Sequence, residues 1–532
     1  MPGYLALVLH AHLPFVRHPE HPRFLEESWL YEAITETYLP LVEMLEGWRR
    51  DRINARITVC LSPTLCAMLL DPLLQARYER RLNGLIELAE REVVRTHWDR
   101  PTQRLAEHYV ERLHELNRLW RACGRNLAAA FRRLQDDGRV ELVTTAATHA
   151  LLPLLVNSPG ALQAQVLAAR DYHRQCFGRD PIGFWLPECA YAPEVEWALV
   201  KSGFRWFMVE SHGLLNALPR PRFGTFAPAF TPNGLAVFGR DWESARQVWS
   251  RHEGYPGDPR YRDFYRDIGF DLDLDYVEPY LPSPGRRGFT GIKYHAITGV
   301  RGEKTLYDPA AARVAVEEHA RHFLRNRVKQ MARIEPAMDR PPVVVAPYDA
   351  ELFGHWWHEG LDFLDTVTRL ALARQPAFNF ITPTDYLRRH STNQIVRPAP
   401  STWGDRGHLG VWLNERNEWI QPHLRAAEQR LSDLAQWHSG DDPLTLRAVK
   451  QIARELMLAQ ASDWPFMVHT GTNADYARHR VETHLCNFLA LYEQITTGKL
   501  DSARLAALEE TNNLFPKLDP GDWVCSAPPQ AP

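Results

Sequence analysis

Short apolar runs rich in β-branched residues recur along the chain, and each is followed by a turn or a helical pattern. Strands that alternate with helices are typical of a parallel sheet, and seven or eight such strands indicate a barrel or a near-barrel. The pattern therefore predicts an α/β fold class. The predicted strands cover residues 5–12, 56–62, 140–146, 182–188, 205–211, 235–240, 343–349 and 378–384.

Helical periodicity replaces this alternation in two long parts of the chain. Residues 66–135 are predicted to form an inserted helical subdomain, because apolar residues recur there at helical spacing over many turns. Residues 401–532 show the same spacing and are predicted to form an all-helical C-terminal domain. At 532 residues the chain is too long for one ordinary core, which also favours several domains. Residues 1–65 and 136–400 then remain for the α/β domain.

Two irregular stretches interrupt the α/β part. Residues 212–232 are rich in Pro and Gly and long for a connection, so we expect a loop that reaches over the cleft at the strand ends. Residues 249–299 carry many aromatic side chains and no regular pattern. Long ordered loops inside a compact domain usually serve function, which makes both stretches candidates for ligand contact.

The composition excludes several classes of partner. The 62 basic and 65 acidic residues leave a net charge of −3, which gives no overall field to attract nucleic acid or a membrane surface. No run approaches the roughly 18 apolar residues of a membrane span. The seven cysteines are scattered and form no CxxC pair, as in the reduced thiols of a cytosolic protein. We therefore expect a cytoplasmic protein with a neutral partner, and no contact with nucleic acid or membrane.

The stretch VVVAPYDAELFGHWWHEG at residues 343–360 is the first candidate site. Its β-branched start predicts a strand buried on both faces, and Asp349 lies at the carboxyl end, where catalytic side chains gather in α/β barrels. Acids, imidazoles and indoles crowd the residues that follow, His355 among them. The alternative is that Asp349 only caps a helix N-terminus.

A second carboxylate is predicted at the same edge of the sheet. Glu188 ends the strand at 182–188, in GFWLPECAY, among apolar neighbours that would limit its contact with solvent. Two carboxylates at one edge are the minimum for glycoside chemistry, one to attack or orient and one to carry the proton. Glu188 and Asp349 are therefore the candidate catalytic pair.

Histidines are predicted at this edge too. His10 and His12 end the first strand, where a spacing of two sends both rings to one face, and His149 follows the third strand. One interpretation is a metal site of amidohydrolase type, in which the metal activates water. Another is that these are hydrogen-bonding or core histidines. The metal interpretation lacks an obvious bridging Lys and leaves Glu188 without a function.

Tryptophan is the outlier of the composition, with 17 residues. Flat indole faces suit the apolar side of sugar rings, although scattered Trp more often fills cores. No phosphate-binding GxxxxGK[ST] or GxGxxG loop follows a strand, and no GxSxG motif is present. The further candidate ligand contacts are Trp29, Trp249, Trp403, Trp412, Trp464 and Asp463.

Five separate motifs, taken in order, resemble those of glycoside hydrolase family 57. They are HAHLPF at 10–15, TTAATHALLPLL at 144–155, FWLPECAY at 184–191, APYDAELFGHWW at 346–357 and ASDWPFM at 461–467. Within that family the chain most resembles the 1,4-α-glucan branching enzymes. The resemblance covers nearly the whole chain and is weakest in the helical insertion and the last dozen residues.

The resemblance implies an incomplete (β/α)7 barrel with a helical insertion, and a C-terminal helical domain that closes one side of the cleft. It implies that Glu188 is the nucleophile and Asp349 the general acid/base of a retaining mechanism, without metal or cofactor. The residues that would line the glucan subsites are His10, His12, Trp29, His149, Phe223, Trp249, His355, Trp403, Trp412, Asp463 and Trp464.

The activity that the resemblance implies is the formation of α-1,6 branches in a glycogen-type α-1,4-glucan by a monomeric enzyme. The alternatives are α-amylase or 4-α-glucanotransferase activity of the same family and, from another class, a non-catalytic glucan-binding protein. One position departs from the family pattern. The branching enzymes carry a tyrosine associated with branching over hydrolysis in the loop at 219–224, and this chain has Phe223. The missing hydroxyl predicts that transfer persists with a larger hydrolytic share, or that overall activity is weak.

Overall fold

Two largely parallel β-sheets form the centre of the molecule. The computed structural model describes residues 3–250, 253–298, 304–373, 378–437 and 442–525. One sheet has the order β3-β2-β1-β8, with β9 also paired to β1, and the other has the order β4-β5-β7-β6, in which β6 runs antiparallel to β7. The strands are β1 (Tyr4–Ala11), β2 (Ile57–Leu61), β3 (Val140–Val143), β4 (Gly183–Phe184), β5 (Trp206–Val209), β6 (Ala229–Phe230), β7 (Ala236–Gly239), β8 (Val343–Asp349) and β9 (Asn379–Phe380).

All the predicted strands are present, and β6 is an additional strand inside the stretch predicted to be a loop. β8 is buried over its first six residues, as its run of β-branched side chains predicts. Pro347 within it cannot donate a ladder hydrogen bond, and it is tolerated because β8 is an edge strand of its sheet. The α/β fold class is therefore confirmed.

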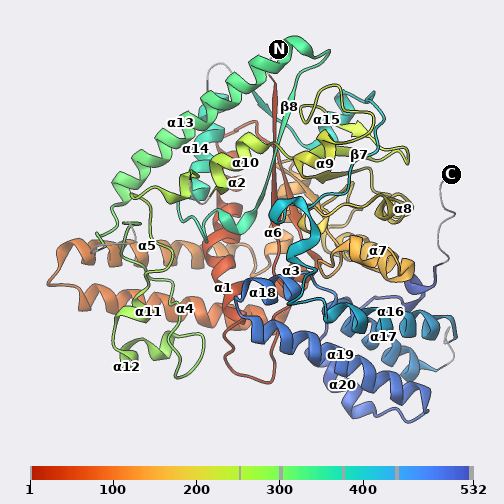
Figure 1. Ribbon diagram of the computed structural model, residues 1–532. Helices are drawn as coiled ribbons and strands as arrows, with labels where there is room; N and C mark the ends of the chain where they lie inside the picture. Colours follow the sequence, from red (N-terminus) through yellow and green to blue (C-terminus); the bar gives the residue numbers. More distant parts are fainter. Residues whose placement is uncertain (1–2, 251–252, 299–303, 374–377, 438–441, 526–532) are drawn as a thin grey trace.

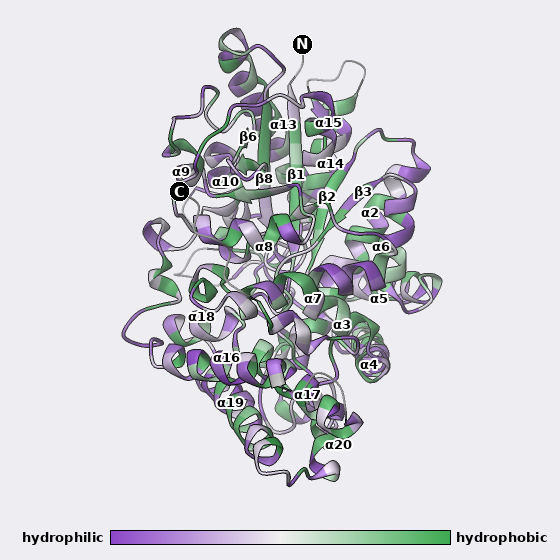
Figure 2. Cartoon of the chain, turned by 90° about the vertical axis from the view of Figure 1, so that its right-hand side faces the viewer, coloured by the Kyte–Doolittle hydropathy of each residue, from purple (hydrophilic) through white to green (hydrophobic). Residues whose placement is uncertain are grey.

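The two sheets approach each other at both edges. An isolated parallel bridge joins Thr144, just after β3, to Phe184 of β4. On the other side, the amide of Asp241, just after β7, donates to the carbonyl of Val345 in β8 at 2.8 Å. Because parallel strands share one direction, their carboxyl ends open on one side of the molecule. The strands lie in the upper half of Figure 2, and the C-terminal helices α16 to α20 lie below them.

Helices surround the sheets and connect successive strands (Figure 1). α1 (Glu27–Ala33) continues through the π-helix η1 (Ile34–Tyr38) into α2 (Leu39–Arg50). A π-helical turn widens the helix locally and is often found at functional sites. The other helices of this part are α7 (Pro159–Phe177), α8 (Glu196–Lys201), α9 (Ser211–Leu215), α10 (Trp242–Trp249), α13 (Pro309–Ile334), α14 (Gly360–Leu372) and α15 (Pro383–Arg389).

The helical insertion consists of α3 (Pro63–Leu70), α4 (Pro72–Arg95), α5 (Arg100–Ala122) and α6 (Leu127–Asp136). α3 and α4 begin where Ser62 and Asp71 cap them, each side chain accepting a hydrogen bond from a backbone amide of the first turn. α4 and α5 pack together as a hairpin that projects to the left in Figure 1. The short helices α11 (Ile268–Asp271) and α12 (Leu274–Val277), from the stretch predicted to be irregular, lie beside this hairpin.

The C-terminal region is helical, as predicted. α17 and α19 pack against each other through a core that contains Leu456 and Phe488, both fully buried. The helices are α16 (Ile420–Trp437), α17 (Pro443–Ala459), α18 (Asp463–Thr470), α19 (Ala474–Thr496) and α20 (Ser502–Thr511). Among the described residues, no helix has both the length and the apolar composition needed to cross a bilayer.

The stretch at residues 212–232 runs to the amino ends of the strands, which corrects the prediction of a loop over the cleft. The carbonyl of Phe226 accepts a hydrogen bond from the amide of Val343, the first residue of β8. Phe230 of β6 pairs with Ala236, the first residue of β7. These contacts hold the stretch against the end of the sheets opposite to Asp349.

Candidate active site

Asp349 is the last residue of β8 and pairs in register with His10 of β1. It precedes the short helix η8 (Ala350–Leu352), but its side chain makes no capping hydrogen bond, so the capping alternative is wrong. Burial raises the pKa of Asp349 well above its usual value, and the charges of Glu351 and Glu188 raise it further, against the opposing charge of Arg240. A carboxyl group that keeps its proton near neutral pH can serve as a general acid.

Glu188 follows β4 in a 3-10 turn and has a φ of +59°. This left-handed backbone is uncommon for a residue with a side chain, and such residues cluster at functional sites. Its Oε2 accepts a hydrogen bond from Trp403 Nε1 at 2.7 Å, and its Oε1 accepts one from Ser462 Oγ at 3.1 Å. Burial nevertheless raises the pKa of Glu188 to about 7. Residues beyond position 400 therefore hold both oxygens of this carboxyl group.

The charge of Glu188 acts on Asp349. The pKa of Glu188 is raised to about 7, and its negative charge helps to raise the pKa of Asp349. Because two negative charges in one site repel, the pair favours a state with one charge and one proton. An attacking carboxylate and a proton donor need that arrangement.

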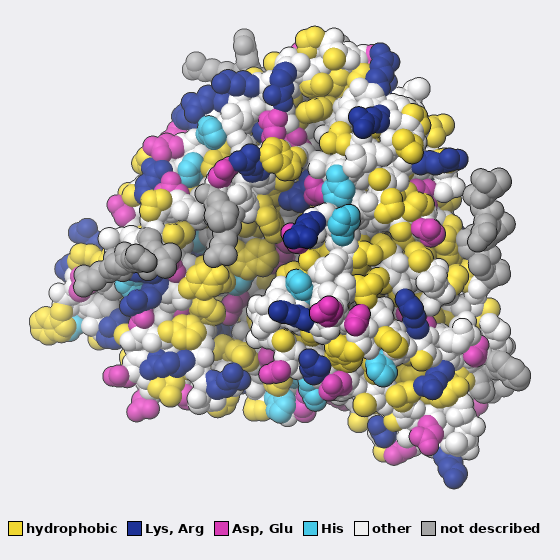
Figure 3. Space-filling view, viewed as in Figure 1, with side chains coloured by type: hydrophobic (Ala, Val, Ile, Leu, Met, Phe, Trp, Pro, Cys, Tyr) yellow, Lys and Arg dark blue, Asp and Glu magenta, His cyan; other side chains and the backbone are white. Residues whose placement is uncertain are grey.

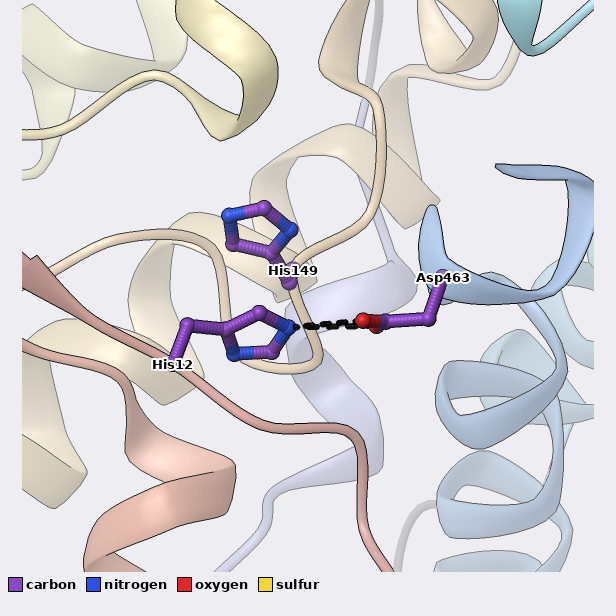
Figure 4. Close-up of side chains that lie close together, drawn as sticks. All are labelled: His12, His149 and Asp463. Atoms are coloured by element: carbon purple, nitrogen blue, oxygen red, sulfur yellow. Dashed lines mark hydrogen bonds and ion pairs between the residues drawn. The ribbon is translucent and has the colours of Figure 1, made fainter. Parts of the chain in front are cut away.

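The predicted histidines meet beside Glu188. His10 Nε2 and His149 Nε2 are 2.9 Å apart, and His149 Nδ1 lies 3.8 Å from Glu188 Oε1. His12 Nε2 lies 3.1 Å from Oδ2 of Asp463 (Figure 4). Burial, and then the neighbouring His12, lowers the pKa of both His10 and His149 well below the usual value. These two rings therefore stay neutral at physiological pH, and a neutral imidazole both donates and accepts a hydrogen bond.

His12, His149 and Asp463 also offer ligand atoms within 4.8 Å of one another, a spacing that could hold a metal ion. Hydrogen bonds within the protein already engage the two rings. His12 Nδ1 lies 2.9 Å from Ser62 Oγ, and His149 Nδ1 lies 2.8 Å from Ser462 Oγ. A metal ion would have to replace the contact between His12 and Asp463 or one of these two. A reaction without metal stays a prediction, which treatment with a chelator tests.

Three neighbouring tryptophan rings extend from Glu188. The ring of Trp403, which donates to Glu188, lies 6.4 Å from the ring of Trp249. The Trp249 ring meets Trp356 edge-on at 6.2 Å, and these two side chains are 40% and 45% exposed. Exposed indole faces suit the apolar faces of sugar rings. The space-filling view is hollowed near its centre, and hydrophobic side chains line the hollow (Figure 3).

Trp412 and Trp464 are core residues, which corrects their prediction as glucan contacts. Trp412 is 2% exposed and belongs to a small apolar cluster with Leu151 and Val411. Trp464 is fully buried, and its Nε1 donates to the carbonyl of Leu458 at 2.7 Å. Neither ring can reach a ligand unless the core opens.

Trp29 and His355 are both partly buried and held by protein neighbours. The Trp29 ring meets Tyr476 edge-on at 5.8 Å. His355 Nδ1 lies 2.5 Å from Glu36 Oε2 in η1, and its ring meets Phe264 edge-on at 5.2 Å. A glucan contact for either residue stays a prediction.

Phe223 lies at the opposite end of the strands from Asp349. Its ring lies 4.9 Å from the guanidinium of Arg222 and 5.9 Å from that of Arg340, a residue that precedes β8. Asp349 ends this strand, and its seven residues span about 20 Å at roughly 3.3 Å each. This corrects the predicted place of Phe223 in a glucan subsite, and it removes the argument for hydrolysis from the missing hydroxyl.

Several side chains around the acids were not predicted as site residues, although Glu351 and Trp356 belong to the acids and indoles noted after Asp349. Glu351 is buried, and its Oε1 accepts hydrogen bonds from the amide of His12, at 3.2 Å, and from the hydroxyl of Tyr38. Arg240 follows β7 and pairs with Glu210 at 2.9 Å. The motif stretches at 346–357 and 461–467 contain three of the missed residues, whereas no motif contains Arg240. The missed residues are Arg240, Glu351, Trp356 and Ser462.

Family models match nearly the whole chain. The model of Glycosyl hydrolase family 57 matches residues 6–398, and the model of the C-terminal part of 1,4-alpha-glucan branching enzyme matches residues 423–523. The chain belongs to glycosyl hydrolase family 57. The family resemblance predicted from the five motifs is confirmed.

Relatives within family 57 carry two kinds of name. A 1,4-alpha-glucan branching enzyme of Thermococcus kodakarensis is 34% identical, covering 100% of this chain and 80% of its own. The GH57-type branching enzyme of Pyrococcus horikoshii superposes with a TM-score of 0.89 at 32% identity, covering 100% of this chain and 98% of that one. The α-amylase AmyC of Thermotoga maritima superposes with a TM-score of 0.93 at 40% identity, covering 99% and 100%.

Proposed function

We propose that this family 57 protein is a retaining enzyme acting on α-glucan, and specifically a 1,4-α-glucan branching enzyme. The observation that carries the proposal is the pair of acids at the carboxyl ends of the strands, Glu188 with a pKa near 7 and Asp349 with a pKa raised well above its usual value. The match of residues 423–523 to the branching-enzyme C-terminal model supports the finer assignment. The branching enzymes of T. kodakarensis and P. horikoshii support it too, because the similarity spans the whole chain.

The first chemical step cleaves an α-1,4 linkage. The proton on Asp349 passes to the glycosidic oxygen, whose bond to the anomeric carbon breaks as Glu188 attacks that carbon. The released chain leaves with the proton, and the retained chain is joined covalently to Glu188. Hydrogen bonds from Trp403 and Ser462 orient the attacking carboxylate.

The second step depends on the acceptor. Asp349, now ionised, takes the proton of an incoming hydroxyl, whose oxygen attacks the anomeric carbon and releases Glu188. A 6-hydroxyl of another glucan chain gives an α-1,6 branch, and water gives hydrolysis. The exposed indoles of Trp249 and Trp356 favour a sugar acceptor, because a sugar stacked on them displaces water from the cleft.

Seven of the parallel strands are interpreted as an incomplete (β/α)7 barrel, namely β1, β2, β3, β4, β5, β7 and β8. The contacts that join the two sheets at both edges support this interpretation. Residues 1–65 and 136–400 would form the barrel, 66–135 the insertion, and 401–532 the domain that closes one side of the cleft. The contacts of Trp403 and Ser462 with Glu188 support that last role. We still expect a cytoplasmic, monomeric enzyme that acts on a glycogen-type glucan.

Hydrolysis is the second candidate function, and the 40% identity to the α-amylase AmyC favours it. Both activities share the first step and differ in the acceptor. The test is incubation with amylose, followed by debranching and chain-length analysis and by an assay of reducing ends. We expect new α-1,6 branches, in the presence of EDTA as well. New reducing ends without branches would identify an α-amylase, and longer unbranched chains would identify a 4-α-glucanotransferase.

A non-catalytic glucan-binding protein would give neither product. Substitution Glu188→Gln in such a protein would change nothing in the amylose assay. We expect the substitution to abolish turnover, while glucan binding persists.

A further inference from the structure

A cavity of about 400 Å³ lies between the inserted helices and the α/β body. α4 and α5 form one wall, α1, η1 and α2 form another, and residues 290–292 and 358–362 complete it. Neither Glu188 nor Asp349 lines this seam cavity. Its volume falls in the range of about 300–1,000 Å³ that is typical of small-molecule sites.

The positive charges that line the seam cavity are all engaged by the protein. Arg262 lies 3.5 Å from Glu36 Oε1. Arg112 pairs with a glutamate of α2 at 2.7 Å, and Arg81 donates to main-chain carbonyls at residues 289–290. A phosphate or another anion would therefore meet no free guanidinium group. Because these arginines already bind carboxylates or carbonyls of the protein, the cavity favours an uncharged ligand.

Four polar side chains of the lining make no hydrogen bond or ion pair within the part of the chain that the structure describes, namely those of Glu32, His108, His358 and Asp362. Of these, His108 and Asp362 are exposed, whereas Glu32 and His358 are partly buried. Burial raises the pKa of Glu32 to about 7 and lowers the pKa of His358 well below its usual value. The cavity thus presents a carboxyl group and a neutral imidazole, which together accept and donate hydrogen bonds. Hydroxyl groups are suited to both.

Two further cavities adjoin the seam cavity. It shares His108, His358 and Asp362 with a neighbouring cavity of about 1020 Å³. On the other side it shares Tyr31 and Arg81 with a cavity of about 120 Å³. A row of adjoining cavities along the hairpin of α4 and α5 suits a linear polymer better than a compact molecule.

We propose that the seam cavity is a second binding site for a segment of α-glucan, separate from the catalytic cleft. The uncharged, hydroxyl-rich ligand follows from the lining, and the choice of α-glucan rests on the proposed function. The η1 residue Glu36 lines the cavity and also holds His355, in the loop that follows Asp349. A chain held in the seam cavity would raise the local concentration of glucan near the cleft.

The test counts binding sites. The cleft-inactive variant Glu188→Gln is titrated with maltohexaose by calorimetry, and the same titration is repeated after adding Glu32→Leu. We expect two sites in the first protein, and in the second a loss of affinity at one site by about tenfold or more, the scale of one hydrogen bond to a charged group. Adding Glu46→Leu instead serves as a matched control, because Glu46 lies on α2 outside the cavity lining and contacts Arg49.

Two unchanged sites after Glu32→Leu, in a protein whose circular dichroism matches the parent, would overturn the proposal. A single site in Glu188→Gln would overturn it as well. If Glu32→Leu fails to fold, His358→Leu replaces it with the same expected outcome. The catalytic assignment fails on a different result, namely no product from amylose with the wild-type protein, so the two failures are distinguishable.

Discussion

Two acids at opposite ends of the same parallel strands have pKa values shifted in opposite directions. At the amino ends, Asp339 accepts a hydrogen bond from Arg340 at 2.7 Å, and this contact lowers the pKa of the Asp339 carboxyl group. At the carboxyl ends, burial outweighs the hydrogen bonds to Glu188 and raises the pKa of its carboxyl group. Asp339 is thus stabilised as an ion, whereas Glu188 is destabilised as an ion.

Backbone conformation also differs between the residues compared at the two ends. His149 and Glu188 at the active end have φ values of +57° and +59° although both carry side chains. Near the amino ends, the left-handed position in the loop beside Phe223 is taken by Gly224, with φ +56°. Glycine adopts this conformation without steric cost. The comparison teaches that Glu188 combines an unfavourable charge with an unfavourable backbone conformation where we propose that substrate binds, and the predictions below test that interpretation.

The largest effect is expected from Glu188→Gln. Loss of the nucleophile should lower turnover roughly 10³-fold or more. The pKa of this group is raised in the folded state from 4.5 to about 7, so ionisation costs stability progressively above pH 4.5, and the full cost applies above about pH 7. The variant should therefore gain up to about 3 kcal/mol in the free energy of unfolding at about pH 8, and little at about pH 4. Urea denaturation of the variant and the wild type at both pH values measures this gain. A gain that is the same at both pH values would contradict the conclusion that the ionised form of Glu188 lowers the free energy of unfolding.

The tryptophans fall into two groups, those exposed for ligand contact and those buried in the core. Trp464→Ala should lower the free energy of unfolding by about 3–5 kcal/mol, because a fully buried indole leaves a cavity. Trp249→Ala should leave unfolding almost unchanged and raise KM for amylose by about threefold to tenfold, the scale of one aromatic contact. Thermal melts and steady-state kinetics on both variants check this. A destabilised Trp249→Ala protein with normal KM would assign Trp249 to the core.

Local patterns explain which parts of this structure could be predicted. The β-branched run before Asp349 and the helical spacing beyond residue 400 are properties of neighbours in sequence, and both elements formed as expected. The burial of Trp464 depends on how the C-terminal helices pack, and the place of Phe223 depends on a contact with Arg340, far along the chain. Neither is visible in a local pattern, and both predictions were wrong. The partners of Glu188 illustrate the limit: Trp403 and Ser462 lie 215 and 274 residues away.

A smaller effect is expected from Trp403→Phe, which keeps a ring but removes the hydrogen bond to Glu188 Oε2. That hydrogen bond lowers the pKa of Glu188, so its loss should raise the pKa further above 7. Activity should rise with pH as Glu188 ionises and fall at higher pH as Asp349 loses its proton. The acidic limb of the profile of kcat/KM should move to higher pH by about one unit, and the alkaline limb should stay. Trp249→Phe is the control, and an unmoved acidic limb in Trp403→Phe would contradict the role of Trp403.

The smallest effect is expected from Phe223→Tyr. Phe223 lies against Arg222 and Arg340 at the amino end of β8, so a hydroxyl added there cannot reach a sugar held between Glu188 and Asp349. We therefore expect the ratio of new branches to new reducing ends on amylose to stay the same within error, with a melting temperature close to that of the wild type. A ratio that shifts toward branching would mean that residues 212–232 leave the amino end of the sheets and close over the cleft during turnover. In that case the separation between the two ends of the strands would hold only for the resting enzyme.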